Sequence, residues 1–293
     1  MDILIQQIVS GLATGGIYGS VALALVMIYE ATDIVNFAQG QMAVVSTYLA
    51  WSLLNAGMPY WAAFAATLLI SFVGGVLLER TVIRPVEGAP VLTQVIVCIG
   101  LLVIFNSALG WIYSYVQKPF PSPFPERPLK VGNIYFGAHD IGALGITILV
   151  LIALYAFFRF TTLGLAMRAA AQNPVSSRLC GIRVGWMLAI GWGLASLIGA
   201  VAGLMVAPIV TLDPNMMAGI LIYAFASATL GGFTSPGGAV LGGLIVGVVE
   251  NLVGTYVSFI GTELKLTVAL AMILIVLVVR PSGLFGRAAV HRV

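Results

Sequence analysis

Residues 91–115 read VLTQVIVCIGLLVIFNSALGWIYSY, and no side chain in this stretch carries a charge. A run of about 20 mostly apolar residues is long enough for a helix to cross the hydrocarbon core of a bilayer. The chain as a whole is 60% hydrophobic and 8% charged, whereas a soluble domain carries about 25% charged residues. So few charges cannot cover a water-exposed surface. The sequence therefore predicts an all-α integral membrane protein, because a helix satisfies its own backbone hydrogen bonds in lipid.

Further apolar runs predict a polytopic bundle of about 8–9 transmembrane helices, forming a single transmembrane domain over residues 1–293. The seventh run is short and ends in Gly231 and Gly232, so it is also compatible with a re-entrant segment. Eight full spans is then the alternative count. The predicted spans are 6–29, 34–54, 60–82, 91–115, 141–158, 186–208, 217–232, 238–259 and 264–279.

The basic residues lie between the apolar runs and indicate the orientation, because cytoplasmic loops are enriched in Lys and Arg. With nine spans and the N-terminus outside, the inner loops hold nine basic residues and the outer loops four. The sequence therefore predicts an outer N-terminus and a cytoplasmic C-terminus, and the inner loop 159–185 contributes most. The inner residues are Arg80, Arg84, Arg159, Arg168, Arg178, Arg183, Arg280, Arg287 and Arg292, and the outer ones are Lys118, Arg127, Lys130 and Lys265.

Neither an enzyme nor a nucleic-acid-binding protein is favoured by this sequence. The net charge of +3 is too small to indicate nucleic acid as a partner. The phosphate loop G-x-x-x-x-G-K-[ST] is missing, and so are C-x-x-C, H-E-x-x-H and G-x-S-x-G. We expect no catalytic residue, no metal and no cofactor in this chain. Cys98, in an apolar run, and Cys180, in a basic loop, are predicted to be free thiols.

The longest outer segment, 117–140, contains five prolines, which cannot continue a helix. An extended loop is expected there. It serves either as a stiff connector, the simpler interpretation, or as a contact for a partner outside the membrane.

Glycines at four-residue spacing form a smooth stripe on the first span, at Gly11, Gly15 and Gly19. Such a stripe lets a neighbouring helix approach closely. Close helix packing is the favoured interpretation, and a seam along which helices slide during transport is the alternative. Three further pairs repeat the spacing: Gly199 with Gly203, Gly238 with Gly242, and Gly243 with Gly247.

The second span has a face of polar and small side chains in a helix that is otherwise apolar. Helical spacing puts its members on one side, and amides at membrane depth need hydrogen-bond partners. The face either makes hydrogen bonds to other helices or lines a polar strip along a substrate path, and the sequence leaves both open. Its members are Asn36, Gln39, Ala43, Ser46 and Ala50.

Glu250 is the acidic residue that the predicted spans place deepest in the membrane. An intramembrane carboxylate is costly and indicates a functional site by default, although a paired structural acid is an equal alternative. Asn251, Lys265 or a backbone group is its expected partner. Glu79 and Arg80 are predicted to form an interfacial pair.

The loop RFTTLGLAMRAAAQNPVSSRLCGIRVGW contains signals for a short helix of about seven residues. Asn173 is a good cap, Pro174 suits the first helical position, and Gly181 is a stop. A helix this short is not stable in water without packing. It is therefore expected to dock, either on this chain or on a cytoplasmic partner.

Four segments, in this order, resemble the permease subunits of branched-chain amino acid ABC importers, the hydrophobic amino acid uptake family, in its shorter permease type. They are IVNFAQGQM at 34–42, RAAAQNPVSSRLCGI at 168–182, ATLGGFTSPGGAVLGGLIVGVVE at 228–250 and RPSGLFGR at 280–287.

The resemblance implies a type II-like importer permease in the bacterial inner membrane. It implies as partners a second homologous permease, two cytoplasmic ATPases that bind the ATP, a periplasmic substrate-binding protein and membrane lipid. Residues 174–181 would be the coupling helix that seats in an ATPase. The residues implied for coupling are Arg168, Gln172, Asn173, Pro174, Ser177, Arg178 and Gly181.

The function expected from the resemblance is ATP-driven import of branched-chain or other hydrophobic amino acids, or of related amides. An ion-coupled secondary carrier that acts through Glu250 without an ATPase is the alternative, and a structural or channel subunit is a third. An apolar substrate needs a mostly apolar path with a few amides. The residues expected along this path are Asn36, Gln39, Gln41, Ser46, Tyr18, Tyr29 and Glu250.

Overall fold

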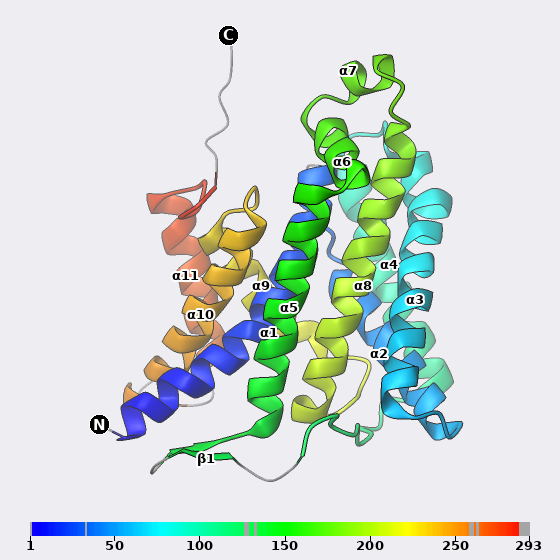
Figure 1. Cartoon of the computed structure of the whole chain (residues 1–293). Helices are drawn as coiled ribbons and strands as arrows, with labels where there is room; N and C mark the ends of the chain where they lie inside the picture. Colours follow the sequence, from blue (N-terminus) through cyan, green and yellow to red (C-terminus); the bar gives the residue numbers. More distant parts are fainter. Residues whose placement is uncertain are drawn as a thin grey trace. The chain divides into compact units, whose positions relative to one another are not determined.

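A computed structural model describes residues 2–32, 34–125, 129–131, 134–257, 261 and 264–286 (Figure 1). The described residues are helical apart from two three-residue strands and the connecting turns. The elements are α1 (Asp2–Thr32), α2 (Gln39–Asn55), α3 (Tyr60–Leu78), the π-helix η1 (Glu79–Ile83), the 3₁₀-helix η2 (Arg84–Val86), α4 (Val91–Tyr113), β1 (Leu129–Val131), β2 (Ile134–Phe136), α5 (Ala138–Phe160), α6 (Thr162–Gln172), α7 (Pro174–Leu179), α8 (Val184–Val210), α9 (Met217–Gly231), α10 (Pro236–Tyr256) and α11 (Lys265–Val279).

Each of the nine predicted spans contains a helix, and the all-α membrane fold is confirmed. By length and composition, six helices in the described residues are long and apolar enough to cross a membrane. Two of the remaining three, α9 and α11, are shorter apolar helices. The seventh predicted run is indeed short, since α9 has 15 residues and ends at Gly231. Gly232 follows with φ of +103°, a left-handed conformation that favours glycine.

The second span begins later than its apolar pattern predicts. Its helix α2 starts at Gln39 rather than at residue 34 and has 17 residues. Asn36 lies before the helix, where its Oδ1 accepts a hydrogen bond from the Ala38 backbone N–H at 3.0 Å. A side-chain amide that binds the backbone two residues on holds the chain in a turn. The predicted polar face of this span therefore starts in a turn and continues into a helix.

Backbone contacts divide the chain into two compact units, which are described separately below. Unit 1 comprises residues 1–26, 124–147 and 219–293. Unit 2 comprises residues 27–123 and 148–218. The helices α1 and α5 each contribute to both units.

Helix α8 is the centre of unit 2, where α2, α3 and α6 all pack against it. The most apolar window of α8 is 72% buried, against 22% for the span that begins with α3 and 17% for α4. Exposed apolar side chains on α3 and α4 are therefore the surface of unit 2 that lipid covers.

Helices α1 and α10 cross closely in unit 1, at the glycines that the sequence singled out (Figure 1). A Cβ placed on Gly15 would lie 2.6 Å from the Gly243 carbonyl oxygen, and one placed on Gly11 would lie 2.6 Å from the Cα of Val248. Real Cβ atoms do not approach backbone this closely. The predicted close packing is confirmed, and sliding along this seam stays a prediction.

In the outer segment 117–140, the described residues 117–125 form no helix, as the prolines predict, and two strands that were not predicted follow them. Strands β1 and β2 pair antiparallel, with Lys130 opposite Tyr135. In unit 2, Lys118 exchanges two backbone hydrogen bonds of 2.9 Å with Leu212. Three of the basic residues from which the orientation is predicted lie outside the described residues: Arg127, Arg287 and Arg292.

The inner loop 159–185 is more ordered than predicted, because it contains two helices rather than one. The additional helix is α6, whose buried residues Gly164, Met167 and Ala170 recur every three positions. That spacing places them on one helix face. The apolar signal for α6 was present in the sequence but was shorter than a membrane span.

Candidate functional site

The polar face of α2 is buried and makes hydrogen bonds within unit 2. Gln39 is fully buried, and its Nε2 donates to the Ala195 carbonyl oxygen of α8 at 3.0 Å. The Asn36 side-chain amide, also fully buried, donates to the Gln39 Oε1 at 3.3 Å. These bonds join the start of α2 to the middle of α8, as the interhelical interpretation expects.

Two glycines of α8 make this contact possible. A Cβ on Gly199 would lie 2.5 Å from the Gln39 Nε2, and one on Gly203 would lie 2.8 Å from the Ala43 carbonyl oxygen. The pair Gly199 and Gly203 therefore lets α2 approach α8 closely enough for its amide to reach a backbone carbonyl.

Further along α2, Ser46 faces α3. Its hydroxyl donates to the Met42 carbonyl oxygen at 2.9 Å and accepts a hydrogen bond of 2.8 Å from Ser71. Ser46 is 4% exposed. The two hydroxyls therefore form another interhelical contact. Tyr29, also in unit 2, is half-buried at the end of α1.

A second polar cluster lies around Gln41, and the sequence did not predict its other members. The Gln41 Nε2 donates to the Pro214 carbonyl oxygen at 3.1 Å, and Asn106 of α4 donates to the same oxygen at 3.0 Å. Asn106 also donates to the Asn215 side-chain oxygen at 2.9 Å and accepts a hydrogen bond from Tyr115 at 3.1 Å. The sequence signal for this cluster was Asn106, one of two amides, with Gln94, in the mostly apolar run 91–115.

Two polar atoms of α2 remain buried without a hydrogen-bond partner among the described residues: the Gln41 Oε1 and the Tyr48 hydroxyl. Gln41 is 6% exposed and Tyr48 1%. An unsatisfied buried polar group costs about 1–3 kcal/mol. Because Gln41 and Tyr48 are seven residues apart, they lie on one side of α2. The Gln41 Oε1 can accept a hydrogen bond from a polar group that enters the protein. The Tyr48 hydroxyl can accept a hydrogen bond from such a group or donate one to it.

Glu250 belongs to a different cluster, in unit 1. The Tyr18 hydroxyl donates to its Oε2 at 2.8 Å, and Tyr223 makes a second side-chain hydrogen bond to the carboxylate. The two tyrosine rings stack with centroids 4.6 Å apart. Lys265 acts on Glu250 electrostatically and lies 3.5 Å from the Asn251 side-chain oxygen. The principal partners of Glu250 are thus Tyr18 and Tyr223, neither of which the sequence predicted as its partner.

The segment implied in ATPase coupling forms α6 and α7, which lie together at one end of α8 (Figure 1). The Asn173 side chain accepts from the Ser176 backbone N–H at 2.9 Å, and Pro174 occupies the first turn of α7. Gly181 follows with φ of +82°. The residues that begin and end this helix are therefore as predicted: Asn173 is its cap, Pro174 its first residue and Gly181 its stop. The helix itself, Pro174–Leu179, has six residues.

One face of α7 is buried and the opposite face is exposed and apolar. Ser177 is 5% exposed and its side of the helix faces the protein, whereas Val175 is 68% exposed and Leu179 86% exposed. The arginines of this segment, Arg168 and Arg178, and the amide of Gln172 are exposed as well. Such a small helix with exposed apolar side chains and flanking cations is suited to bind a protein partner.

The candidate residues therefore fall into three groups. The first group is the second span with Tyr29, and the second is the coupling segment; both belong to unit 2. The third group is Tyr18 with Glu250, in unit 1. The roles of all of them in a path or in coupling stay predictions.

Comparisons with known proteins relate the whole chain to membrane permeases. The family described as "Branched-chain amino acid transport system / permease component" matches residues 7–277. The high-affinity branched-chain amino acid transport system permease protein BraD of Pseudomonas aeruginosa is 30% identical over 99% of this chain and 98% of its own. The corresponding LivH protein of Salmonella typhimurium is also 30% identical, over 99% and 97%.

Among solved structures, PsaBC from Streptococcus pneumoniae in complex with Fab aligns with a TM-score of 0.50 over 93% of this chain and 91% of its own. At 15% identity this likeness concerns the fold alone. The match to the family extends over nearly the full length and includes α2, the coupling segment and α10. This chain therefore belongs to the family of permease components of branched-chain amino acid transport systems.

Proposed function

We propose that this chain is the membrane-spanning subunit of an importer that moves branched-chain or other hydrophobic amino acids, or related amides, across a bacterial inner membrane. The names of the relatives give branched-chain amino acids as the substrate of those proteins. Full-length similarity supports the extension of that substrate class to this chain. ATP hydrolysis in partner subunits drives the transport, and the chain itself binds no cofactor.

The exposed apolar face of α7 is the observation that carries the proposal. Leu179 is 86% exposed although it lies on a six-residue helix capped at both ends. An isolated helix of this length is not stable by itself, and its apolar face has no cover among the described residues. We assign this face to a groove of a cytoplasmic ATPase, so that motion of the ATPase is passed through α7 to α8.

The full assembly contains this chain, a second homologous permease, two ATPases and a periplasmic binding protein. The chain is oriented with its N-terminus outside and its C-terminus in the cytoplasm, as the distribution of basic residues favours. In this orientation α7 faces the cytoplasm, where ATP is available, and the segment around Lys118 faces the binding protein.

The path for the substrate follows α2 in unit 2. The Gln41 Oε1 and the Tyr48 hydroxyl are buried and unpartnered among the described residues, which supports their use by a passing polar group. The ammonium and carboxylate groups of an amino acid need such partners when they leave water. Neutral amides and hydroxyls suit a path that must also release its substrate, because a ring of charges would hold it too tightly.

The coupling assignment is tested by Leu179→Asp in the chain expressed together with its ATPase and permease partners. A carboxylate on the docking face is expected to reduce the amount of ATPase that co-purifies with the chain by about tenfold or more. Uptake of labelled leucine should fall by a similar factor. The matched control for ATPase retention is Val116→Asp, because Val116 is 67% exposed and lies far along the chain from α7. Leucine uptake is not compared in this control, since Val116 is next to the segment proposed to face the binding protein. ATPase retention equal in both variants would contradict the assignment.

The path is tested separately by Gln41→Leu, measured as the concentration dependence of leucine uptake. Loss of the buried carbonyl is expected to raise the KM by about tenfold, since an unmade hydrogen bond in a dry site costs about 1–3 kcal/mol. Thr47→Val is the control, because the Thr47 hydroxyl is already bonded to the Ala43 carbonyl oxygen at 2.8 Å. An unchanged KM in Gln41→Leu would place the path elsewhere, and uptake by the purified chain without an ATPase would overturn the proposed function.

A further inference from the structure

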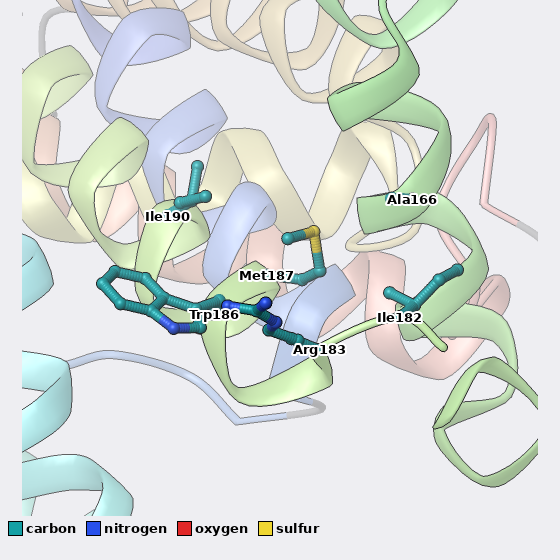
Figure 2. A pocket seen from close by; sticks show the side chains of 6 residues that line it. All are labelled: Ala166, Ile182, Arg183, Trp186, Met187 and Ile190. Atoms are coloured by element: carbon teal, nitrogen blue, oxygen red, sulfur yellow. The ribbon is translucent and has the colours of Figure 1, made fainter. Parts of the chain in front are cut away.

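An apolar groove of about 350 Å³ lies in unit 2 between α6 and the first two turns of α8 (Figure 2). This volume is at the lower end of the range for ligand pockets, about 300–1,000 Å³. Figure 2 shows one lining side chain on α6 and the others on α8 or on the segment just before it. The lining residues are Ala166, Ile182, Arg183, Trp186, Met187 and Ile190.

The floor of the groove is firmly packed. Ala170, Val184 and Leu188 form a buried cluster, and the lining residues Ile182 and Met187 pack against it. The floor of the groove is therefore part of the packed contact between α6 and α8. Apolar surface of this kind is unfavourable in water, so its occupant has an apolar part.

One arginine lines the groove and two others lie against the first turn of α8. Arg183 is itself a lining residue and is exposed. The Arg80 guanidinium lies over the Trp186 ring, 3.4 Å from its centroid. Arg84 lies against Gly185, where an added Cβ would be 3.0 Å from its Nη2. Three cations thus surround the first turn of α8.

The π-helix η1 explains how two of these cations reach α8. It extends α3 beyond Leu78 and precedes the 3₁₀-helix that begins at Arg84. Such wide turns inside a helix frequently occur at functional sites. Arg80 stacks on Trp186, and its predicted pairing with Glu79 is present as an electrostatic attraction.

Glu79 attracts two of these cations, Arg84 and, more weakly, Arg80. Glu79 is 1% exposed and its Oε2 has no hydrogen-bond partner among the described residues. Glu87 is exposed and acts on Glu79 electrostatically. The Arg80 Nε is also buried without a hydrogen-bond partner in the described part of the chain. Glu79 therefore offsets part of the positive charge of Arg80 and Arg84, and Arg183 is the arginine that lines the groove itself.

The groove lies at the end of two helices that are long and apolar enough to cross a membrane, the α8 span and the α3 span. The ends of such helices lie where the acyl chains meet the headgroups, a level that Trp side chains such as Trp186 prefer. An apolar groove with basic residues around it, at this level, complements a molecule with an acyl chain and an anionic head. Basic pockets between membrane helices bind anionic lipid headgroups in this way.

We propose that this groove binds one anionic phospholipid, with part of an acyl chain against Met187 and Ile190 and the phosphate on Arg183. Arg80 and Arg84 contribute to the positive field but make no assigned contact. The lipid then supports the joint between α7 and α8, because Ile182 and Arg183 are the residues of that joint. The proposal concerns a binding site and does not depend on the transported substrate.

Native mass spectrometry of the purified full-length chain tests it, with phosphatidylglycerol and phosphatidylcholine of the same acyl composition as probes. The wild-type chain is expected to retain phosphatidylglycerol at concentrations where phosphatidylcholine is lost. Arg183→Gln should weaken phosphatidylglycerol retention about fivefold, the contribution of one basic residue near an anionic lipid. Arg159→Gln is the control, because Arg159 is exposed at the end of α5 and outside the groove.

A second variant tests the acyl chain rather than the phosphate. Ala166→Trp fills the groove and is expected to remove the bound lipid while the midpoint of thermal unfolding stays near that of the wild type. Equal retention of both lipids by the wild type, or equal retention by Arg183→Gln and Arg159→Gln, would overturn the proposal. A third outcome would also overturn it: no bound lipid, and a groove that is protected from solvent only after an ATPase subunit is added. The groove would then be a contact surface for that protein.

Discussion

At the residue scale, the polar groups buried in this chain differ in how completely they are satisfied. Gln39 and Ser46 have partners on neighbouring helices, whereas Gln41 keeps a free carbonyl oxygen. In unit 1, Glu250 is held by the Tyr18 hydroxyl. A satisfied group fixes helix positions, and an unsatisfied one is available to a substrate or to water. Buried polar residues that look alike in the sequence can therefore be told apart by their hydrogen bonds. Those with partners are candidates for a structural role, and those without are candidates for contact with the substrate.

Tyr18→Phe is expected to lower the free energy of unfolding by about 1.5–3 kcal/mol, because it removes a hydrogen bond to a buried carboxyl group while it keeps the stacked ring. The measurement is unfolding of the purified chain in detergent. Tyr256→Phe is the matched control, since Tyr256 is 56% exposed and on the same helix as Glu250. Equal effects of the two substitutions would show that the bond of Tyr18 to Glu250 contributes nothing to stability.

At the element scale, glycines decide which helices can touch. The crossing of α1 and α10 depends on Gly15 and Gly243, where the backbones are in contact. The approach of α2 to α8 depends on Gly199 and Gly203 in the same way. The spacing of four residues was visible in the sequence for the stripe that contains Gly15, for Gly243 with Gly247 and for Gly199 with Gly203. The helix against which each stripe packs was not visible.

Gly15→Ala and Gly145→Ala are expected to have opposite effects. A Cβ on Gly15 meets the Gly243 carbonyl oxygen at 2.6 Å, so the substitution should destabilise the chain by about 1–3 kcal/mol. Gly145, in α5, has open space around the Cβ position. Alanine there should stabilise the helix by about 0.5–1 kcal/mol. Thermal unfolding of both variants measures the difference, and a neutral Gly15→Ala would mean that the crossing is looser than described.

At the scale of the whole molecule, the chain is two units joined through α1 and α5. All the arginines near the groove and all the residues of the coupling segment belong to unit 2, whereas Glu250 and its tyrosines belong to unit 1. One unit therefore contains both the proposed docking helix and the proposed path along α2. A movement of α7 can reach the path through α8 alone, because α8 contacts both α2 and α7.

The proposed orientation of the chain predicts how its two native thiols react. Cys180 is exposed next to α7, and Cys98 is buried at 2% exposure; both are free. A membrane-impermeant maleimide should leave Cys180 unlabelled in intact cells and label it in inside-out vesicles. In a Cys180→Ser background, Ala56→Cys in the exposed turn between α2 and α3 should show the reverse. Labelling of Cys180 from outside would invert the topology and remove the coupling proposal.

The sequence by itself determined that this protein is a bundle of membrane helices, where those helices lie within a few residues, and where the short helix α7 begins and ends. These features follow from local physics. Runs of apolar residues partition into lipid, and Asn173, Pro174 and Gly181 act on their own turns of the chain.

Only the tertiary structure decided which buried polar groups have partners and what surrounds the ends of the helices. The contacts of Gln41 with Pro214, of Tyr18 with Glu250 and of Arg80 with Trp186 join residues more than 100 positions apart. A hydrophobic pattern reports which side of a helix avoids water, but not which helix covers it. Partners in space are chosen by the packing of the whole chain, because close approach of two backbones depends on glycines and side chains from both helices.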